Sequence, residues 1–289
     1  MLGNLAAEAG RHDEALGHFQ RALALEPDHR AALFGLASAY RALGRAGDAL
    51  VGFRRLLGLN PRDGQATLAT ADLLVEGEKQ DEARRVLEQA MAGGSLPAVL
   101  LNRLGELLAL AKRSGDAHAR FEAAIAAKPD LALPHFNLAV LLEEKSDLAK
   151  TVAEYRRAIE IQPKYYQAQF NLGRLAGRLG DAAEAERQLA AAVAANPDFV
   201  QGYLYLSKLL LDRGELGRAE EMARQGLAHD AGDRGGPFGW FLLADILNRT
   251  SRPQEAEEAA RRGREIEAAG RGGRAAQAVG AVAGGTGTP

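Results

Sequence analysis

The chain repeats itself every 34 residues. The triplet Phe136-Asn137-Leu138 returns 34 positions later as Phe170-Asn171-Leu172, and several columns of similar residues recur with the same spacing along the 289 residues. A period of this length is typical of solenoids and related arrays, in which each unit contacts mainly its neighbours. The period therefore constrains the fold more than any single motif does.

The recurring columns predict a pair of helices in each unit. Glycine marks the middle of several units, where a first helix would end in a left-handed residue, and proline follows the second helix. The glycine column is Gly10, Gly44, Gly180 and Gly214, and the proline column is Pro27, Pro61, Pro129, Pro163 and Pro197. Each unit is thus predicted to be a helix, a tight turn and a second helix of about fourteen residues.

Two further columns are expected to fill the seam between the helices. The leucine column is Leu2, Leu36, Leu104, Leu138, Leu172 and Leu206, broken by Thr70. The small column is Gly3, Ala37, Ala71, Gly105, Ala139, Gly173 and Ser207. Small residues let neighbouring helices approach closely. The hydrophobic fraction of 47% is rich in Ala and Leu, which are good helix formers, so the chain is predicted to be all-α.

These columns resemble the tetratricopeptide repeat. Residues 166–199 carry its signature as Leu172, Gly173, Ala185, Leu189, Ala192 and Pro197. The resemblance implies an all-α, right-handed α-solenoid (superhelix) of stacked helix-turn-helix units. It covers residues 1–269, as a truncated unit 1–29 followed by 30–63, 64–97, 98–131, 132–165, 166–199, 200–236 with a loop insertion, and 237–269. Units 64–97 and 200–233 match least well, the first because of Thr67, Thr70 and Ser95.

The two chain ends lead to separate expectations. Residues 270–289 are rich in Gly and Ala without a helical stripe, so we expect a disordered tail. Met1 falls partway into a first helix, from which we expect further repeats or another domain upstream; the alternative is a frayed terminus of a complete protein.

Charge and composition disfavour several classes of function. The chain has 36 basic and 38 acidic residues, whereas a nucleic-acid binder such as the pentatricopeptide array would carry a basic excess. We therefore expect no nucleic-acid partner, and no segment is apolar enough to span a membrane. The sequence has no cysteine, and the six histidines lack metal-ligand spacing. No catalytic motif is present, so we predict a protein that is not an enzyme and needs no cofactor or metal.

The first helices of tetratricopeptide units line the concave wall of the array, so the resemblance places the candidate binding site there. The predicted peptide-binding residues of this groove are Arg103, Phe136, Asn137, Phe170, Asn171, Arg174, Arg178, Tyr205 and Lys208. An asparagine ladder in this column holds peptide backbone in O-linked N-acetylglucosamine transferases, and amides both donate and accept hydrogen bonds. The alternative is that Asn137 and Asn171 are solvated or bond to adjacent helices.

The basic residues of this face predict an acidic segment or a terminal carboxylate as partner. Glu106, Glu143, Glu144 and Asp212 share the wall, however, so an ordinary solvated face is the alternative. The aromatic residues, including Phe34, would form side-chain pockets or pack along the inner edge. The order of residues typical of a carboxylate clamp is missing.

The sequence therefore predicts a non-catalytic scaffold or adaptor that binds an extended peptide or helix of a partner protein. The alternative is the substrate-recruiting C-terminal region of a larger enzyme, a glycosyltransferase or sulfatase-like hydrolase, with its catalytic domain upstream of Met1. The cytoplasm is the expected compartment, or the periplasm if the chain extends upstream.

Overall fold

The computed structural model describes the backbone of residues 2–92, 94, 96–230 and 236–283, and side chains as far as Ala269. Within these residues the chain is entirely helical, in sixteen helices joined by short turns. The chain forms two compact units, Met1–Thr151 and Val152–Pro289, and the division falls within α10.

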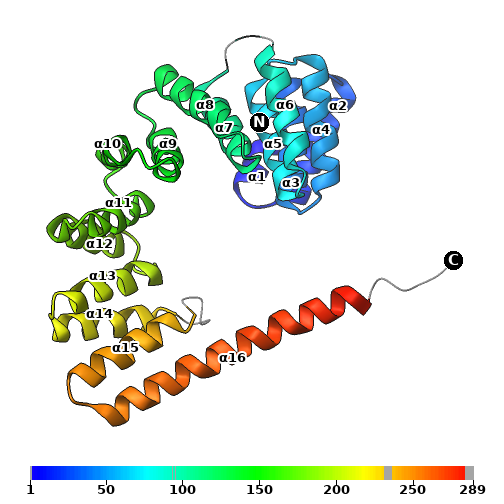
Figure 1. Ribbon diagram of the computed structural model, residues 1–289. Coiled ribbons are helices and arrows are strands. Elements are labelled where there is room, and N and C mark those ends of the chain that lie inside the picture. The colour runs from blue at the N-terminus through cyan, green and yellow to red at the C-terminus, as the bar shows by residue number, and fades with distance from the viewer. Residues whose placement is uncertain (1, 93, 95, 231–235, 284–289) are drawn as a thin grey trace. The chain divides into compact units, whose positions relative to one another are not determined.

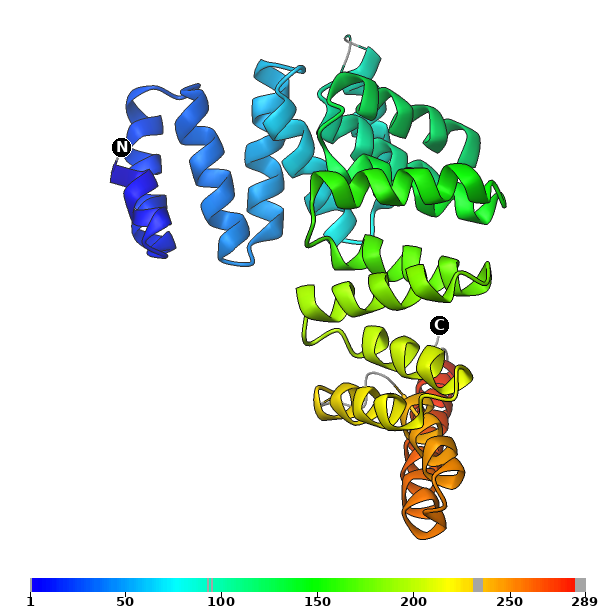
Figure 2. The same ribbon diagram turned by 90° about the vertical axis from the view of Figure 1, so that its left-hand side faces the viewer.

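Consecutive helices pack in antiparallel pairs, as Figures 1 and 2 show within each unit. The helices of the first unit are α1 (Leu2–Glu8), α2 (His12–Leu25), α3 (Arg30–Ala42), α4 (Ala46–Leu59), α5 (Gly64–Glu76), α6 (Gln80–Ala92), α7 (Ala98–Leu110), α8 (Ser114–Ala127) and α9 (Ala132–Glu144). After α10 (Leu148–Ile161), the second unit contains α11 (Tyr166–Arg178), α12 (Ala182–Ala195), α13 (Val200–Asp212), α14 (Leu216–Ala228), α15 (Phe238–Arg249) and α16 (Pro253–Ala283).

A left-handed residue separates the two helices of every pair. The predicted glycines have positive φ, with values of 72° at Gly10 and Gly44, 83° at Gly180 and 77° at Gly214. The pairs without glycine adopt the same conformation at the corresponding position. These residues are Glu78 (φ 59°), Lys112 (60°), Ser146 (61°) and Ser251 (60°). Because this conformation disfavours non-glycine residues, the hydrogen bonds of the turn and the packing of the pair must offset its cost there.

The small column brings the two helices of a pair together, as predicted. A Cβ atom on Gly105 of α7 would lie 2.5 Å from Cε1 of Phe121 on α8, and one on Gly173 would lie 2.9 Å from Cγ of Leu189. Ser207 of α13 is fully buried, and its hydroxyl donates a 2.7 Å hydrogen bond to the carbonyl of Ala219 on α14. The apolar core follows these seams, with Phe53, Phe121 and other large side chains almost fully buried.

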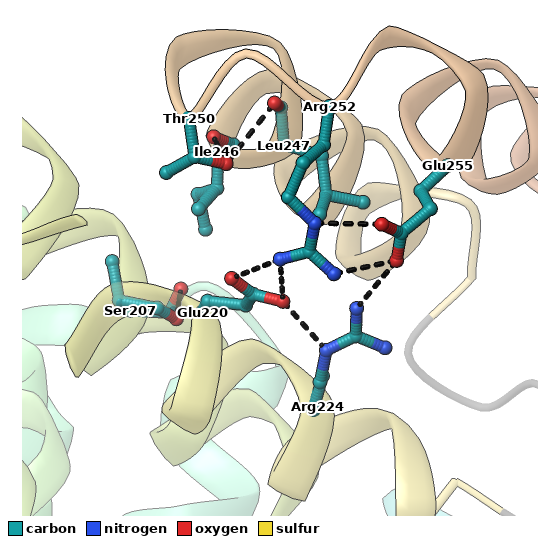
Figure 3. Close-up of polar contacts among 9 residues, drawn as sticks. Ser207, Glu220, Arg224, Ile246, Leu247, Thr250, Arg252 and Glu255 are labelled. Carbon is teal, nitrogen blue, oxygen red and sulfur yellow. Dashed lines mark hydrogen bonds and ion pairs between the residues drawn. The ribbon is translucent and has the colours of Figure 1, made fainter. Parts of the chain in front are cut away.

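Ion pairs also link successive pairs of helices. In the second unit, Arg252 donates to both carboxylate oxygens of Glu220 at 2.8 Å, while Glu220 also accepts from Arg224 at 2.9 Å (Figure 3). One repeat earlier, Arg218 donates to Glu186 at 2.6 Å. Burial alone would raise the pKa of Glu220, but the hydrogen bonds from Arg224 and Arg252 hold it below the ordinary value. The contact therefore recurs with the period of the sequence.

A carboxylate fixes the start of α5 in the first unit. Asp63 is 4% exposed; it accepts a hydrogen bond from the backbone N–H of Ala66, and Arg30 donates to it at 2.6 and 3.0 Å. Burial would raise the pKa of Asp63, but Arg30 and the backbone N–H groups outweigh burial, so the pKa lies below its usual value. Asp63 thus caps α5 and ties it to α3.

The last helix differs from the sequence-based expectation. α16 has 31 residues, and Figure 1 shows it extending past the end of α15. The backbone of residues 270–283 is helical where we expected disorder, and residues 284–289 lie outside the described part of the chain. An alanine-rich segment that continues an existing helix needs no new nucleus, which favours the extension. Part of the loop insertion expected before Phe238, residues 231–235, also lies outside the described residues.

The contact between the small column and the large side chain that faces it can be tested at Gly105. We expect Gly105→Val to lower the free energy of unfolding by about 1–3 kcal/mol, because the new side chain overlaps the Phe121 ring. Gly115→Ala is the matched control, since nothing lies within 4 Å of a Cβ there and alanine favours a helix. Urea unfolding followed by circular dichroism measures both. Equal stability of Gly105→Val and wild type would contradict the packing described.

The Asp63 contact predicts a pH dependence. Because its folded pKa is lowered, Asp63 contributes its full stability above the unfolded pKa of about 3.9 and loses it as pH falls through the folded pKa. Asp63→Asn keeps a capping acceptor but removes the charge. We expect it to be about 1 kcal/mol less stable than wild type at neutral pH, with the difference shrinking in acid. Urea titrations over a pH series measure this, and a difference independent of pH would contradict the ion pair.

Candidate binding surface on the first helices

The first helix of each pair contacts the first helix of a neighbouring pair. In the first unit such contacts join α1 with α3, α5 with α7, and α7 with α9; in the second they join α11 with α13, and α13 with α15. The exposed and half-buried side chains of these helices form a surface in each unit, which we call the first-helix wall. All nine predicted binding residues lie on these helices.

A connected polar ladder crosses the wall of the first unit. Arg103 on α7 pairs with Asp72 on α5 at 2.9 Å and with Glu106 at 2.8 Å. The amide of Asn137 on α9 donates to Oδ1 of Asn102 and to Oε1 of Glu106, each at 3.0 Å. Asn102 in turn donates to Glu106 at 2.8 Å. Side chains from three successive first helices are therefore linked through Glu106.

This ladder compensates the charge of Arg103. Its side chain is 26% exposed, and burial lowers its pKa. The hydrogen bond to Glu106 and the charge of Asp72 more than offset burial, so the net pKa lies above the ordinary value. Arg103 is thus a fixed cation held between two carboxylates rather than an isolated positive charge.

A shallow cavity of about 380 Å³ lies over the ladder. Its lining includes Arg103, Glu106 and Asn137 together with the apolar side chains of Leu110 and Val140. Leu110 is 67% exposed and Val140 37% exposed, so both present apolar surface to solvent. The cavity thus combines fixed hydrogen-bonding groups with apolar surface, which is the usual composition of a recognition site.

Aromatic rings form the centre of the wall in the second unit. Phe170 on α11 makes edge contacts with Phe199 (centroids 5.0 Å apart) and with Tyr205 on α13 (5.1 Å). Tyr166 also packs against Phe199, at 4.9 Å. These spacings are those of favourable edge-to-face pairs. Phe170 is half-buried, whereas Tyr205 remains 42% exposed and faces solvent from the edge of the cluster.

The polar residues of the same wall differ in their contacts. Asn171 is half-buried, and its amide makes no hydrogen bond to another described residue. Lys208 pairs with both carboxylate oxygens of Asp212, at 2.5 and 2.6 Å. Arg174 is half-buried and Arg178 exposed, and both are engaged in contacts. The charge of Lys208, like that of Arg103, is therefore compensated locally.

The structure brings some of the predicted residues together. Arg103 and Asn137 share Glu106, and Phe170 touches Tyr205. Phe136 is half-buried on α9 beside Asn137. Asn137 and Asn171 belong to different units, so the expectation that they point into one groove stays a prediction. Phe34 packs edge-on against Phe53 at 5.3 Å, which is the edge-packing alternative.

Two members of the ladder were missed in the sequence. Asn102 occupies the column of Phe136 and Phe170, and Asp72 occupies the column of Glu106. Comparing each wall column one repeat upstream would have found both. Their contact could not be inferred from the spacing, because it depends on the side-chain direction across two helices.

Comparison with known proteins identifies the family. The sequence profile of the tetratricopeptide repeat matches residues 1–63, 102–166 and 170–234, which together exceed half of the chain. The chain therefore belongs to the tetratricopeptide repeat family. Proteins of this family generally mediate interactions between proteins, and the family is not catalytic. The weak unit 64–97 falls outside the matched segments, whereas 200–233 falls inside them.

Solved structures share the fold at low identity. A chain of the APC/C hetero-tetramer Cut9–Hcn1 is 16% identical with a TM-score of 0.64; the match covers 84% of this chain and 47% of that one, so this chain spans about half of it. The C-terminal part of a repeat protein from Cytophaga hutchinsonii is 14% identical with a TM-score of 0.60, and the match covers 78% of this chain and 93% of that one. YrrB, described as having an unusual peptide-binding site, is 18% identical with a TM-score of 0.51, and the match covers 64% of this chain and 95% of that one.

No curated protein matches the chain in the corresponding comparison. The described helices include none long and apolar enough to cross a bilayer. Among the described residues, no group of three or more acidic or histidine side chains is placed to hold a metal ion.

Removing Glu106, the central carboxylate of the ladder, is expected to lower the free energy of unfolding. Glu106→Ala would leave the buried amide of Asn102 and the guanidinium of Arg103 without this partner, so we expect a loss of about 1–3 kcal/mol in the free energy of unfolding. Glu122→Ala removes an exposed carboxylate of α8 and should change stability by less than about 0.5 kcal/mol. Urea unfolding compares the two variants, and an equal effect would show that the ladder does not contribute.

Proposed function

We propose that the first-helix wall binds an extended peptide or a helix of a partner protein, and that the chain acts as a scaffold or adaptor. The observation that carries this proposal is the ladder in the first unit. It holds the Asn137 side chain in place beside an open cavity, with Leu110 and Val140 exposed next to it. A wall whose polar groups are already fixed loses little conformational entropy when a partner binds.

The hydrogen-bonding pattern favours recognition of peptide backbone. Both bonds made by Asn137 use its N–H donors, which leaves the amide oxygen as an acceptor for a backbone N–H. In the second unit, Asn171 offers both a donor and an acceptor, on the wall that also carries the half-exposed Tyr205. Within each unit the amide would hold peptide backbone. Apolar side chains of a partner would contact Leu110 and Val140 in the first unit and Tyr205 in the second.

The charges of the wall support a neutral or mixed partner better than a strongly acidic one. Arg103 is held between Asp72 and Glu106, and Lys208 is paired with Asp212. An acidic segment would have to compete with these carboxylates. We therefore place the contribution of charge to binding below that of the amides and the apolar side chains.

The double variant Asn137→Ala with Asn171→Ala tests this function. We expect it to recover less of the partner than wild type in crosslinking pull-downs from the native cell, with unchanged helicity by circular dichroism. Removing hydrogen bonds of this kind costs about 1 kcal/mol each, so recovery should fall several-fold.

Asn60→Ala with Asn196→Ala is the matched control. These two asparagines end α4 and α12, in the turns between pairs, and are not part of the first helices. We expect the control to recover the same partners as wild type. Equal recovery of every partner by the Asn137 and Asn171 variant would contradict the proposal.

A further inference from the structure

A second cavity opens between the second helices α4 and α6 of the first unit. Its volume is about 610 Å³, within the range of small-molecule sites. It is lined by residues of α4, α6 and the intervening α5, including Leu57, Val86 and Ala90. The cavity shares no lining residue with the one on the first-helix wall, so it is separate from the surface of the proposed function.

The cavity exists where the sequence departs from its own repeat. Thr70 stands in the leucine column, and Thr67 stands where Leu33 and Leu101 lie in the adjacent units. Both threonines line the cavity and are almost fully buried, with Thr70 at 0% and Thr67 at 1% exposure. A shorter, polar side chain therefore replaces a leucine at two neighbouring positions of the seam, and the space opens at this point.

The hydroxyl of Thr70 has an unused hydrogen-bonding capacity. Thr67 donates to the backbone carbonyl of Asp63 at 2.8 Å, as threonine commonly does in a helix. Thr70 Oγ1 is buried and has no hydrogen-bond partner among the described residues. A buried hydroxyl without a partner is costly, so Thr70 weakens the seam at this position.

The rim of the cavity carries one uncompensated positive charge. Arg54 forms an ion pair with Glu82 across the opening. Arg85 is exposed and donates through Nε to the backbone carbonyl of Asp81 at 3.3 Å, but no carboxylate of the described residues pairs with it. A guanidinium in this state binds a carboxylate in a bidentate geometry. One positive charge is balanced by one carboxylate, whereas a phosphate carries more charge than the site would neutralise.

We propose that this cavity binds an organic monocarboxylate: an apolar body that occupies the space between α4 and α6 that the two threonines leave open, with its carboxylate on Arg85. The ligand is either a free carboxylic acid or the C-terminal residue of a peptide, since both present an apolar group beside one carboxylate. The site does not depend on the peptide-binding role of the first-helix wall.

Methyl-resolved NMR of the full chain tests the site, with the methyl groups of Leu57, Thr70 and Val86 as reporters. The probes are phenylpropanoate and its neutral amide, and acetyl-Gly-Phe with a free or an amidated C-terminus. We expect saturable shifts of these methyl groups with both carboxylates, and binding weaker by about tenfold or more with the amides, because a charge-assisted hydrogen bond is lost. Tighter binding of phenylpropanoate would assign the site to a free acid, and tighter binding of the peptide to a chain end.

Three variants complete the test. Thr70→Leu restores the residue of the leucine column; we expect it to abolish the shifts and to raise the melting temperature. Arg85→Gln should weaken carboxylate binding about tenfold while leaving the amides unaffected. Arg55→Gln is the control, because Arg55 is an exposed arginine of helix α4 that pairs with Asp28 and does not line the cavity.

The proposal is overturned if no probe shifts the reporter methyl groups, if amides and carboxylates bind equally, or if Thr70→Leu binds as well as wild type. A lower melting temperature of Thr70→Leu would show that the cavity cannot hold a leucine and would equally contradict the account. None of these outcomes affects the pull-down of the asparagine variant, so failure here is distinguishable from failure of the proposed function.

Discussion

The close approach of the first and second helix in each pair is the contact on which the rest of this structure depends. At Gly105 and Gly173 there is no room for a Cβ atom against the facing side chain. A helix pair held this closely presents one seam to the next pair, and a lone pair cannot bury that seam. Stacking therefore follows from the small column, and the wall of first helices follows from stacking.

The same constraint explains why the turn has one conformation throughout. Once the two helices are packed, the connecting residue must reverse the chain within one position, and a left-handed residue does so. Glu78, Lys112, Ser146 and Ser251 adopt this conformation without the advantage of glycine. The backbone hydrogen bonds that close these turns and the packing of the seam together offset this cost.

The periodic columns made most of the fold predictable. Helix pairs, turn glycines, the ends of second helices before proline and the small column all follow from the period, because each column has one structural role. The binding site was less predictable. Asn137 bonds to Asn102 on the adjacent helix, and this contact depends on the direction of the Asn102 side chain, which the spacing does not reveal. In the sequence, Thr67 and Thr70 indicate only a weak repeat. Whether a cavity forms beside them depends on how closely α4 and α6 pack, which the sequence does not reveal.

The first-helix wall and the cavity between α4 and α6 depart from the repeat in different ways. On the first-helix wall, the residue at a given position changes from one repeat to the next. The polar side chains there bond to one another in the ladder, and the seam between the helices is unchanged. Between α4 and α6, the departure lies in the seam itself and removes apolar volume. A repeat protein can acquire sites in both ways, because each unit depends mainly on its neighbours and tolerates a local change.

Residue-resolved native-state amide hydrogen exchange tests the central claim most directly. The account predicts protected segments that coincide with the paired helices from α2 to α15. It also predicts that the small-column residues Gly105, Gly173 and Ser207 are among the most protected of their helices. Fast exchange at these three amides would contradict it.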